Sequence, residues 1–345
     1  MMTQSRHYPR APRDMKNRLA AVLLLAGAAL ASLAWTGPAF GQAKPARVGI
    51  LTFSAVTDES RRKFPWMESF RRTLADRGWI EGKNVSFEYR SARDDPSQFA
   101  AAAVALAEIN VNVIMTDGTP ALRAAAAATR TIPIVAIDFT SDPIAEGYAE
   151  SYAQPGGNVT GVFLDAPEFA GKWFELLRAI VPDLSRVAVL WDPGPGANHL
   201  HAVRSVAGSL DIKLQVHEVR KPDNLGRAFS VLRGQSQAVI ILPSPMIYSQ
   251  SERLAKLALD HRLPATSMAR AFADAGGIIA YGPDARLVGK RIAVFVAKNL
   301  DGRKPAELPV ERPTTFRLVV NLKTAKALGI TIPQSILLRA DEVIK

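Results

Sequence analysis

The chain has 345 residues, a formal net charge of +11 and no cysteine. This length allows two domains, each with a hydrophobic core of its own. The absence of cysteine excludes disulfides and attachment to lipid through a cysteine thioether. Lys and Arg form no dense cluster with interleaved aromatic residues, so the positive charge does not indicate nucleic acid as a partner.

The first predicted element is a secretory signal peptide at residues 1–43. An apolar segment at 19–33 follows a basic stretch at 10–18, and small residues suited to peptidase cleavage come after it, up to Ala43. This order of basic, apolar and small residues is typical of a cleaved leader. Two alternatives stay open: the apolar segment is about long enough to be a retained membrane anchor, and Met15 is a possible true start.

After the leader, short β-branched runs alternate with amphipathic helical segments. In the first half, strands are predicted at 47–53, 85–90, 111–116 and 132–139, with helices at 66–77, 97–109 and 120–129. The rhythm restarts in the second half, with helices at 169–181, 198–210, 224–233 and 249–261 and strands at 186–191, 213–219, 238–242, 264–266 and 277–281. Such alternation predicts parallel, doubly wound α/β sheets.

The two similar halves predict two α/β lobes with a cleft between them. We place the N-terminal lobe at 44–158 and the C-terminal lobe at 159–283, and expect 284–312 and 313–345 to cross back and complete them. Gly156-Gly157-Asn158 is the predicted hinge, since these residues tolerate unusual backbone dihedrals.

Candidate site residues follow from the rule that open parallel sheets bind ligands at the carboxyl ends of their strands. In the first half these are Phe53, Ser54, Thr119, Asp138 and Phe139. Thr119 is predicted as an N-cap, with free backbone N–H groups that favour a carboxylate; a capping role and ligand contact are compatible. Asp138 is the candidate for a cationic group of the ligand.

In the second half the strand ends supply Trp191, Asn198, Ser244, Tyr281 and Asp284. Trp191 offers a surface for stacking, or alternatively fills the core of its lobe. Asn198 could cap the helix that follows it. Nearby prolines fix the shapes of these loops, which suits a pre-formed pocket.

No catalytic constellation is found. The chain has no G-x-S-x-G elbow, no phosphate-binding loop, no H-E-x-x-H and no dinucleotide fingerprint. His199 and His201 are two positions apart near a helix start, so their side chains diverge and no metal site is expected. We therefore expect a protein that binds a small molecule, uses no cofactor and is not an enzyme.

Four segments resemble the bacterial ABC transporter substrate-binding proteins of the tryptophan/tyrosine-binding type. They are 132–162, Lys172–Asp192 (KWFELLRAIVPDLSRVAVLWD), Ala275–Asp284 (AGGIIAYGPD) and the tail 308–345. The resemblance implies a type I periplasmic-binding-protein fold with a three-crossover hinge. It also implies a periplasmic location and transient delivery of a solute to an ABC permease in the inner membrane.

On this basis we expect a monomer that captures an amino acid or related zwitterion, aromatic ones included. A ligand-binding module of a sensor system and a secreted α/β enzyme with an unrecognised site are the alternatives. One departure from the resemblance concerns the turn after the third strand, where relatives often carry a small Ala/Thr-Pro-Thr sequence. Here Thr116-Asp117-Gly118-Thr119-Pro120 stands instead, and Asp117 would weaken a site for ligand carboxylates if it faced inward.

Overall fold

The first five strands form one parallel sheet. The computed structural model describes residues 44–345 except 56, 58–64, 165–167 and 194–196, so the predicted signal peptide lies outside the described residues. The sheet has the order β2-β1-β3-β4-β5, and every neighbouring pair in it is parallel. Its strands are β1 (Ala46–Thr52), β2 (Val85–Ser91), β3 (Val113–Asp117), β4 (Ile134–Asp138) and β5 (Val159–Phe163).

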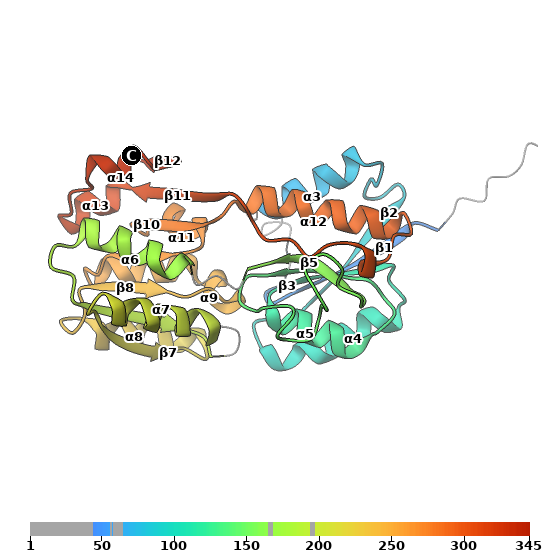
Figure 1. Cartoon of the computed structure of the whole chain (residues 1–345), viewed down its shortest axis with the longest axis horizontal. Helices are drawn as coiled ribbons and strands as arrows, with labels where there is room; N and C mark the ends of the chain where they lie inside the picture. The colour runs from blue at the N-terminus through green and yellow to red at the C-terminus, as the bar shows by residue number, and fades with distance from the viewer. Residues whose placement is uncertain (1–43, 56, 58–64, 165–167, 194–196) are drawn as a thin grey trace, which may run out of the picture. The chain divides into compact units, whose positions relative to one another are not determined.

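Helices cover both faces of this sheet. They are α3 (Pro65–Asp76), α4 (Phe99–Glu108, after the short 3₁₀ turn η1 at Pro96–Gln98), α5 (Thr119–Ala128) and the late α12 (Ala285–Leu300). Alternate side chains of a strand point to opposite faces. Accordingly, Val48 and Ile50 of β1 pack with α3 and α12, whereas Leu51 packs with α4 and α5. Figure 1 shows these two helix pairs on opposite sides of the sheet.

The second sheet has seven strands in the order β12-β11-β10-β9-β8-β6-β7. Only β10 and β11 pair antiparallel. The strands are β6 (Arg186–Trp191), β7 (Lys213–Glu218), β8 (Ala238–Ile241), β9 (Ala265–Ser267), β10 (Ile279–Pro283), β11 (Phe316–Asn321) and β12 (Glu342–Ile344).

Helices again cover both faces of the second sheet. The elements are α6 (Glu168–Ile180), α7 (Ala197–Ser209), η2 (Pro222–Asn224), α8 (Leu225–Leu232), α9 (Pro245–Ser249), α10 (Ser251–Asp260), α11 (Arg270–Asp274), α13 (Leu322–Leu328) and α14 (Gln334–Leu337). The remaining 3₁₀ turn, η3 (Pro305–Glu307), contacts β5 of the first sheet. Val187 and Val189 of β6 pack in the core that contains α6 and α7, and Leu190 packs in the core that contains α8 and α10. The predicted helix 249–261 corresponds to α10, and the short helix α9 before it, which ends one residue before Gln250, was not predicted.

Three segments connect the two sheets. The chain first crosses after β5, crosses back between β10 and α12, and crosses a third time before β11 (Figure 1). Before the third crossing, residues 308–311 lie along the outer edge of β5, where Thr160 Oγ1 donates to Leu308 O at 3.2 Å and Glu311 N donates to Gly161 O at 2.9 Å. The predicted fold class, two doubly wound lobes with a three-crossover hinge, is confirmed. Residues Pro45–Lys345 form one compact unit.

The position of the first crossing differs from the sequence-based expectation. The run Val159–Phe163 pairs with β4 and is fully buried in the first sheet, so the crossing comes after Phe163 and not before Val159. Gly156-Gly157-Asn158 precedes β5 and lies within the first lobe. The Asn158 side chain ties this loop to the first lobe, because its Nδ2 donates to Ile132 O at 2.9 Å and to Thr129 O at 3.2 Å.

Among the described residues, no helix has both the length and the apolar character needed to cross a membrane.

Candidate functional site

A cavity of about 250 Å³ lies where strand ends of the two sheets converge. Residues after β1, β3 and β4 line it from the first lobe, and residues after β8, β9 and β10 line it from the second. This placement is the one that open parallel sheets favour for ligands. The volume suits a small organic molecule, since ligand pockets begin at a few hundred Å³.

Most of the cavity wall is apolar. Phe53, Trp66 and Phe139 line it from the first lobe, and Tyr248 and Met268 line it from the second. Full burial of one large apolar side chain or ligand group contributes about 1.5–3 kcal/mol. A ligand with an aromatic or aliphatic body would therefore gain much of its binding energy from this wall.

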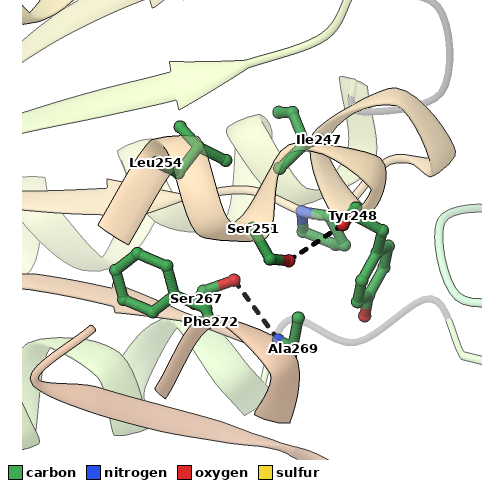
Figure 2. Close-up of a pocket in the computed structure, with 8 residues that line it drawn as sticks. Ile247, Tyr248, Ser251, Leu254, Ser267, Ala269 and Phe272 are labelled. Atoms are coloured by element: carbon green, nitrogen blue, oxygen red, sulfur yellow. Dashed lines mark hydrogen bonds between the residues drawn. The ribbon is translucent and has the colours of Figure 1, made fainter. Parts of the chain in front are cut away.

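Figure 2 shows the packing behind the second-lobe side of this wall. Tyr248 and Ala269 belong both to the cavity lining and to the recess drawn there, which has no room for water. Two local hydrogen bonds lie in its wall: Ser251 Oγ donates to Tyr248 O at 2.8 Å, and Ala269 N donates to Ser267 Oγ at 3.2 Å. Tyr248 therefore lines the cavity with tightly packed residues behind it.

Gly118 brings the two lobes into contact beside the cavity. It has a φ of +89°, which favours glycine, and it lies at the N-terminus of α5. A Cβ at this position would run into the Pro245 ring, with Pro245 Cδ at 3.3 Å. The turn after β3 can therefore approach the start of α9 only because residue 118 has no side chain.

Asp117 is the carboxylate that the first lobe presents to the cavity. It is half-buried, and its carboxylate makes no hydrogen bond or ion pair with any other described residue. Burial raises the pKa of Asp117 to about 6, and the nearby negative charge of Asp138 raises it further. The sequence analysis expected Asp117 to weaken a site for ligand carboxylates if it faced inward. Asp117 does line the cavity, so that condition is met.

Three arginines line the cavity from the second lobe and the crossing segments: Arg270, Arg286 and Arg317. Arg270 donates to both carboxylate oxygens of Glu342, at 2.6 and 2.7 Å, and its Nε donates to Asp274 at 3.1 Å. These hydrogen bonds raise the pKa of Arg270 and lower that of Glu342. Arg270 therefore belongs to the scaffold of the site and carries no spare charge.

Five of the ten candidate residues from the sequence line the cavity: Phe53, Ser54, Phe139, Ser244 and Asp284. Several also hold local structure. Ser54 Oγ donates to Asp94 at 2.5 Å, Ser244 Oγ accepts from Ile247 N at 3.1 Å as the N-cap of α9, and Asp284 caps α12 by accepting from Arg286 N at 2.9 Å. Their ligand-binding role stays a prediction.

Asp138 and Thr119 are not in the cavity lining. Asp138 is fully buried, and its two oxygens accept hydrogen bonds from the hydroxyls of Thr119 (2.8 Å), Thr140 (3.0 Å) and Ser141 (2.6 Å) and from Thr140 N (2.9 Å). Burial raises the pKa of Asp138, and these hydrogen bonds oppose that rise. The network holds the loop after β4, which carries Phe139.

Gly118 is the N-cap of α5, so the expectation that Thr119 would be the N-cap was wrong.

This network yields a stability prediction. We expect Asp138→Ala to lower the free energy of unfolding by about 1–3 kcal/mol, because four buried donors lose their acceptor. Asp138→Asn should cost less than about 1 kcal/mol, since the amide keeps one acceptor oxygen and removes a buried charge. Urea unfolding at neutral pH measures both. Equal losses in the two variants would show that the charge matters and the acceptor oxygen does not.

Trp191, Asn198 and Tyr281 also lie outside the cavity lining. Trp191 packs against the core of the second lobe. Tyr281 packs on Phe169 and Phe316, with ring centroids 5.8 and 6.1 Å away. Asn198 is the second residue of α7 and not its cap; its Nδ2 lies 3.5 Å from Thr140 O of the first lobe.

Strand parity explains the position of Tyr281. Ala280 and Gly282 line the cavity, and neighbouring side chains of a strand point to opposite faces, so Tyr281 must point away from it. The alternation of side chains along this strand could have been used in the sequence analysis to exclude Tyr281 from the site. In contrast, Trp66, Arg286 and Arg317 follow no strand end directly, and only the crossing segments and α3 bring them to the cavity.

The histidines do not form a metal site within the part of the chain that the structure describes, where no group of three potential His, Asp or Glu ligands is found. His199 is buried and His201 is exposed, as expected for residues two apart on a helix.

Comparisons with known proteins agree with this architecture. A curated tyrosine-binding protein of Clostridioides difficile (strain R20291) is 22% identical over 267 residues, which is 76% of each chain. The crystal structure of a conserved domain protein of Vibrio cholerae O1 biovar El Tor is 28% identical, with a TM-score of 0.78 over 87% of this chain and all of the other. An ABC domain of Streptococcus pneumoniae, solved in complex with L-Trp, is 24% identical with the same TM-score and coverage.

The family assignment rests on a match to a family model. The model described as ABC transporter substrate binding protein matches residues 55–344, from just after β1 to the C-terminal strand, and so includes all three crossing segments. The chain belongs to the ABC transporter substrate binding protein family.

Proposed function

We propose that this chain is the solute-capturing component of an ABC importer. After export and removal of its leader, it acts as a monomer in the periplasm and traps an amino acid or related zwitterion between its lobes. It then delivers the solute, chemically unchanged, to a permease in the inner membrane. The observation that carries the proposal is the cavity at the strand ends of both lobes, with its apolar wall and charged groups of both signs.

The relatives support this ligand class. One is named a tyrosine-binding protein, and another was solved with L-Trp. The aromatic wall formed by Phe53, Trp66 and Phe139 is compatible with such ligands. Closure of the lobes around a solute would let the permease distinguish the loaded protein from the empty one, because a ligand shifts the population toward the state it binds better.

Thermal unfolding of the purified mature protein tests the proposal. Amino acids, sugars and dicarboxylates are added singly, and we expect one or more amino acids to raise the midpoint. A ligand at 100 times its Kd adds about 2.7 kcal/mol, which corresponds to a shift of about 5 °C or more for a protein of this size. Mass spectrometry should recover the stabilising compound unchanged. Conversion to a product would instead support a secreted enzyme, and stabilisation by sugars alone would contradict the amino-acid assignment.

A further inference from the structure

The charged residues that line the cavity are not all neutralised by the protein. Arg270 is paired with Asp274 and Glu342. Arg317 lies 3.6 Å from Asp284, whose other oxygen accepts from the backbone of α12. Asp117 and Arg286 have no ion pair or side-chain hydrogen bond with any residue for which the structure gives a placement. The cavity therefore offers one carboxylate and one guanidinium group that have no direct partner in the described protein.

The negative charge belongs to the first lobe. Asp117 ends β3. The Asp138 carboxylate on β4 raises the pKa of Asp117, and the charge of Asp117 in turn raises the pKa of the Tyr248 hydroxyl on α9. Neither is a cation. A ligand carboxylate at the N-terminus of α5 would meet the Asp117 charge, whereas a ligand ammonium group would be attracted by it and could form a charge-assisted hydrogen bond.

The positive charge belongs to the start of α12 and to β11. Arg286 lies in the first turn of α12, Arg317 is the second residue of β11, and Asp284 is the single carboxylate between them in the ion-pair pattern. The charge of Glu342 also acts on both guanidinium groups, but its carboxylate hydrogen-bonds to Arg270, so the Arg286 guanidinium keeps its donors open to a ligand. Arg317 Nε is also buried without a hydrogen-bond partner among the described residues. A guanidinium group is suited to bind a carboxylate through two parallel hydrogen bonds.

We propose that the cavity recognises a ligand that carries a protonated amine and a carboxylate, the amine bound by Asp117 and the carboxylate by Arg286 and Arg317. This inference rests on the proposed function and specifies which residues select the solute. This assignment of the two ligand groups differs from the sequence-based expectation, in which Asp138 binds the cationic group and the N-terminus of the helix at Thr119 binds the carboxylate. The apolar part of the ligand lies against Trp66 and Phe139. Different side chains therefore bind the amine, the carboxylate and the apolar part of the ligand.

A set of three related probes tests each end separately. L-Tryptophan has both charges, tryptamine lacks the carboxylate, and 3-indolepropionate lacks the ammonium group. Calorimetric titration of the mature protein gives the Kd of each. We expect Asp117→Asn to weaken tryptophan and tryptamine at least tenfold and to leave 3-indolepropionate within threefold. Arg286→Gln should show the reverse pattern, with tryptophan and 3-indolepropionate weakened and tryptamine little changed.

Asp183→Asn is the control, since it neutralises an exposed carboxylate that does not line the cavity, at a position whose φ of +53° suits Asn. It should change the Kd of tryptophan by less than threefold. If Asp117→Asn weakens all three probes equally, or none of them, the assignment of the amine to Asp117 is overturned.

The pH dependence gives a second readout. With a pKa of about 6 for Asp117 in the free protein, acid neutralises the group that binds the amine. The Kd of tryptophan should rise about tenfold between pH 7.5 and pH 5, and in Asp117→Asn it should stay nearly constant. A wild-type Kd that does not change over this range would count against the proposal.

The outcomes separate this inference from the proposed function. If amino acids bind but Asp117→Asn and Arg286→Gln have no selective effect, the residue assignment is wrong and solute capture stands. If only uncharged solutes bind, the ligand class is wrong. If no compound of the thermal panel or the probe set binds, both proposals are contradicted.

Discussion

Replacement of Gly289 by alanine is expected to lower the free energy of unfolding by about 2–4 kcal/mol. Gly289 is buried on α12 where α3 crosses it. A Cβ there would lie 2.8 Å from Trp66 C and 2.9 Å from Trp66 Cα, and closer still to the Trp66 carbonyl oxygen. These are backbone atoms of α3 and cannot move aside as the end of a flexible side chain can. The two helices must therefore separate, which opens the core that they share with β1.

Gly171→Ala is the matched control for this experiment. Gly171 is an exposed residue of α6, and a Cβ there would have no atom within 4 Å. Alanine is favoured over glycine in a helix interior by about 0.5–1 kcal/mol, so this variant should be slightly more stable than the parent. Urea unfolding measures both variants. If Gly289→Ala were as stable as Gly171→Ala, the close approach of α3 and α12 would not contribute to stability.

The Gly289 substitution should also affect ligand binding. Trp66, the residue that Gly289 touches, lines the cavity. A shift of α3 would move this ring, so we expect weaker binding of any ligand whose apolar body packs on it.

Acidification is expected to destabilise the protein through His199. This side chain is 2% exposed on α7 and stacks on Trp173, with ring centroids 6.5 Å apart. Neither ring nitrogen has a hydrogen-bond partner within the described parts of the chain. Burial lowers the pKa of His199 from 6.5 to about 4. The unfolded chain therefore binds a proton more readily than the folded one in this range.

The sign and size of the effect follow from this difference in pKa. Stability is lost as the pH falls from about 6.5 toward about 4, and the loss attributable to His199 between pH 7.5 and pH 4.5 is about 2.5 kcal/mol. His199→Phe removes the titrating group and keeps a flat aromatic ring beside Trp173. Its free energy of unfolding should fall less with acid than that of the parent, by about this amount, in urea unfolding at the two pH values.

Comparison with His199→Phe is needed because two buried carboxyl groups, Asp117 and Asp138, act in the opposite direction. The pKa values of Asp117 and Asp138 are raised by burial, so the folded state takes up those protons first and gains stability as the pH falls. Parallel pH profiles for the parent and His199→Phe would mean that His199 is protonated in the folded protein without cost.

The order of helices and strands was accessible from the sequence because each element is a short, strongly patterned run. The strand Arg186–Trp191 was predicted with the bounds that the structure shows. The errors occurred where local pattern is ambiguous. The five-residue strand Val159–Phe163 was not predicted, and the boundary between the lobes was placed before it, because nothing local shows that it pairs with β4.

The candidate site was predictable in part, for a related reason. Strand ends such as Phe53 and Phe139 reach the cavity because the carboxyl ends of parallel strands share one edge of the sheet. The sequence could not separate Asp117 from Asp138, two carboxylates at neighbouring strand ends. In the fold, hydroxyl groups of the loop after β4 surround Asp138, while Asp117 faces the cavity.

By itself, the sequence determined the alternation of strands and helices, the two lobes and the edge at which a ligand would bind, since these depend on local periodicity and on the geometry of parallel sheets. Only the tertiary structure decided which charges face the cavity. Arg286 and Arg317 come from the start of α12 and from β11, the elements that follow the second and third crossings, far along the chain from Asp117. Their meeting depends on packing between distant residues, such as the close approach of α12 to α3 at Gly289, and a local pattern carries no information about such contacts.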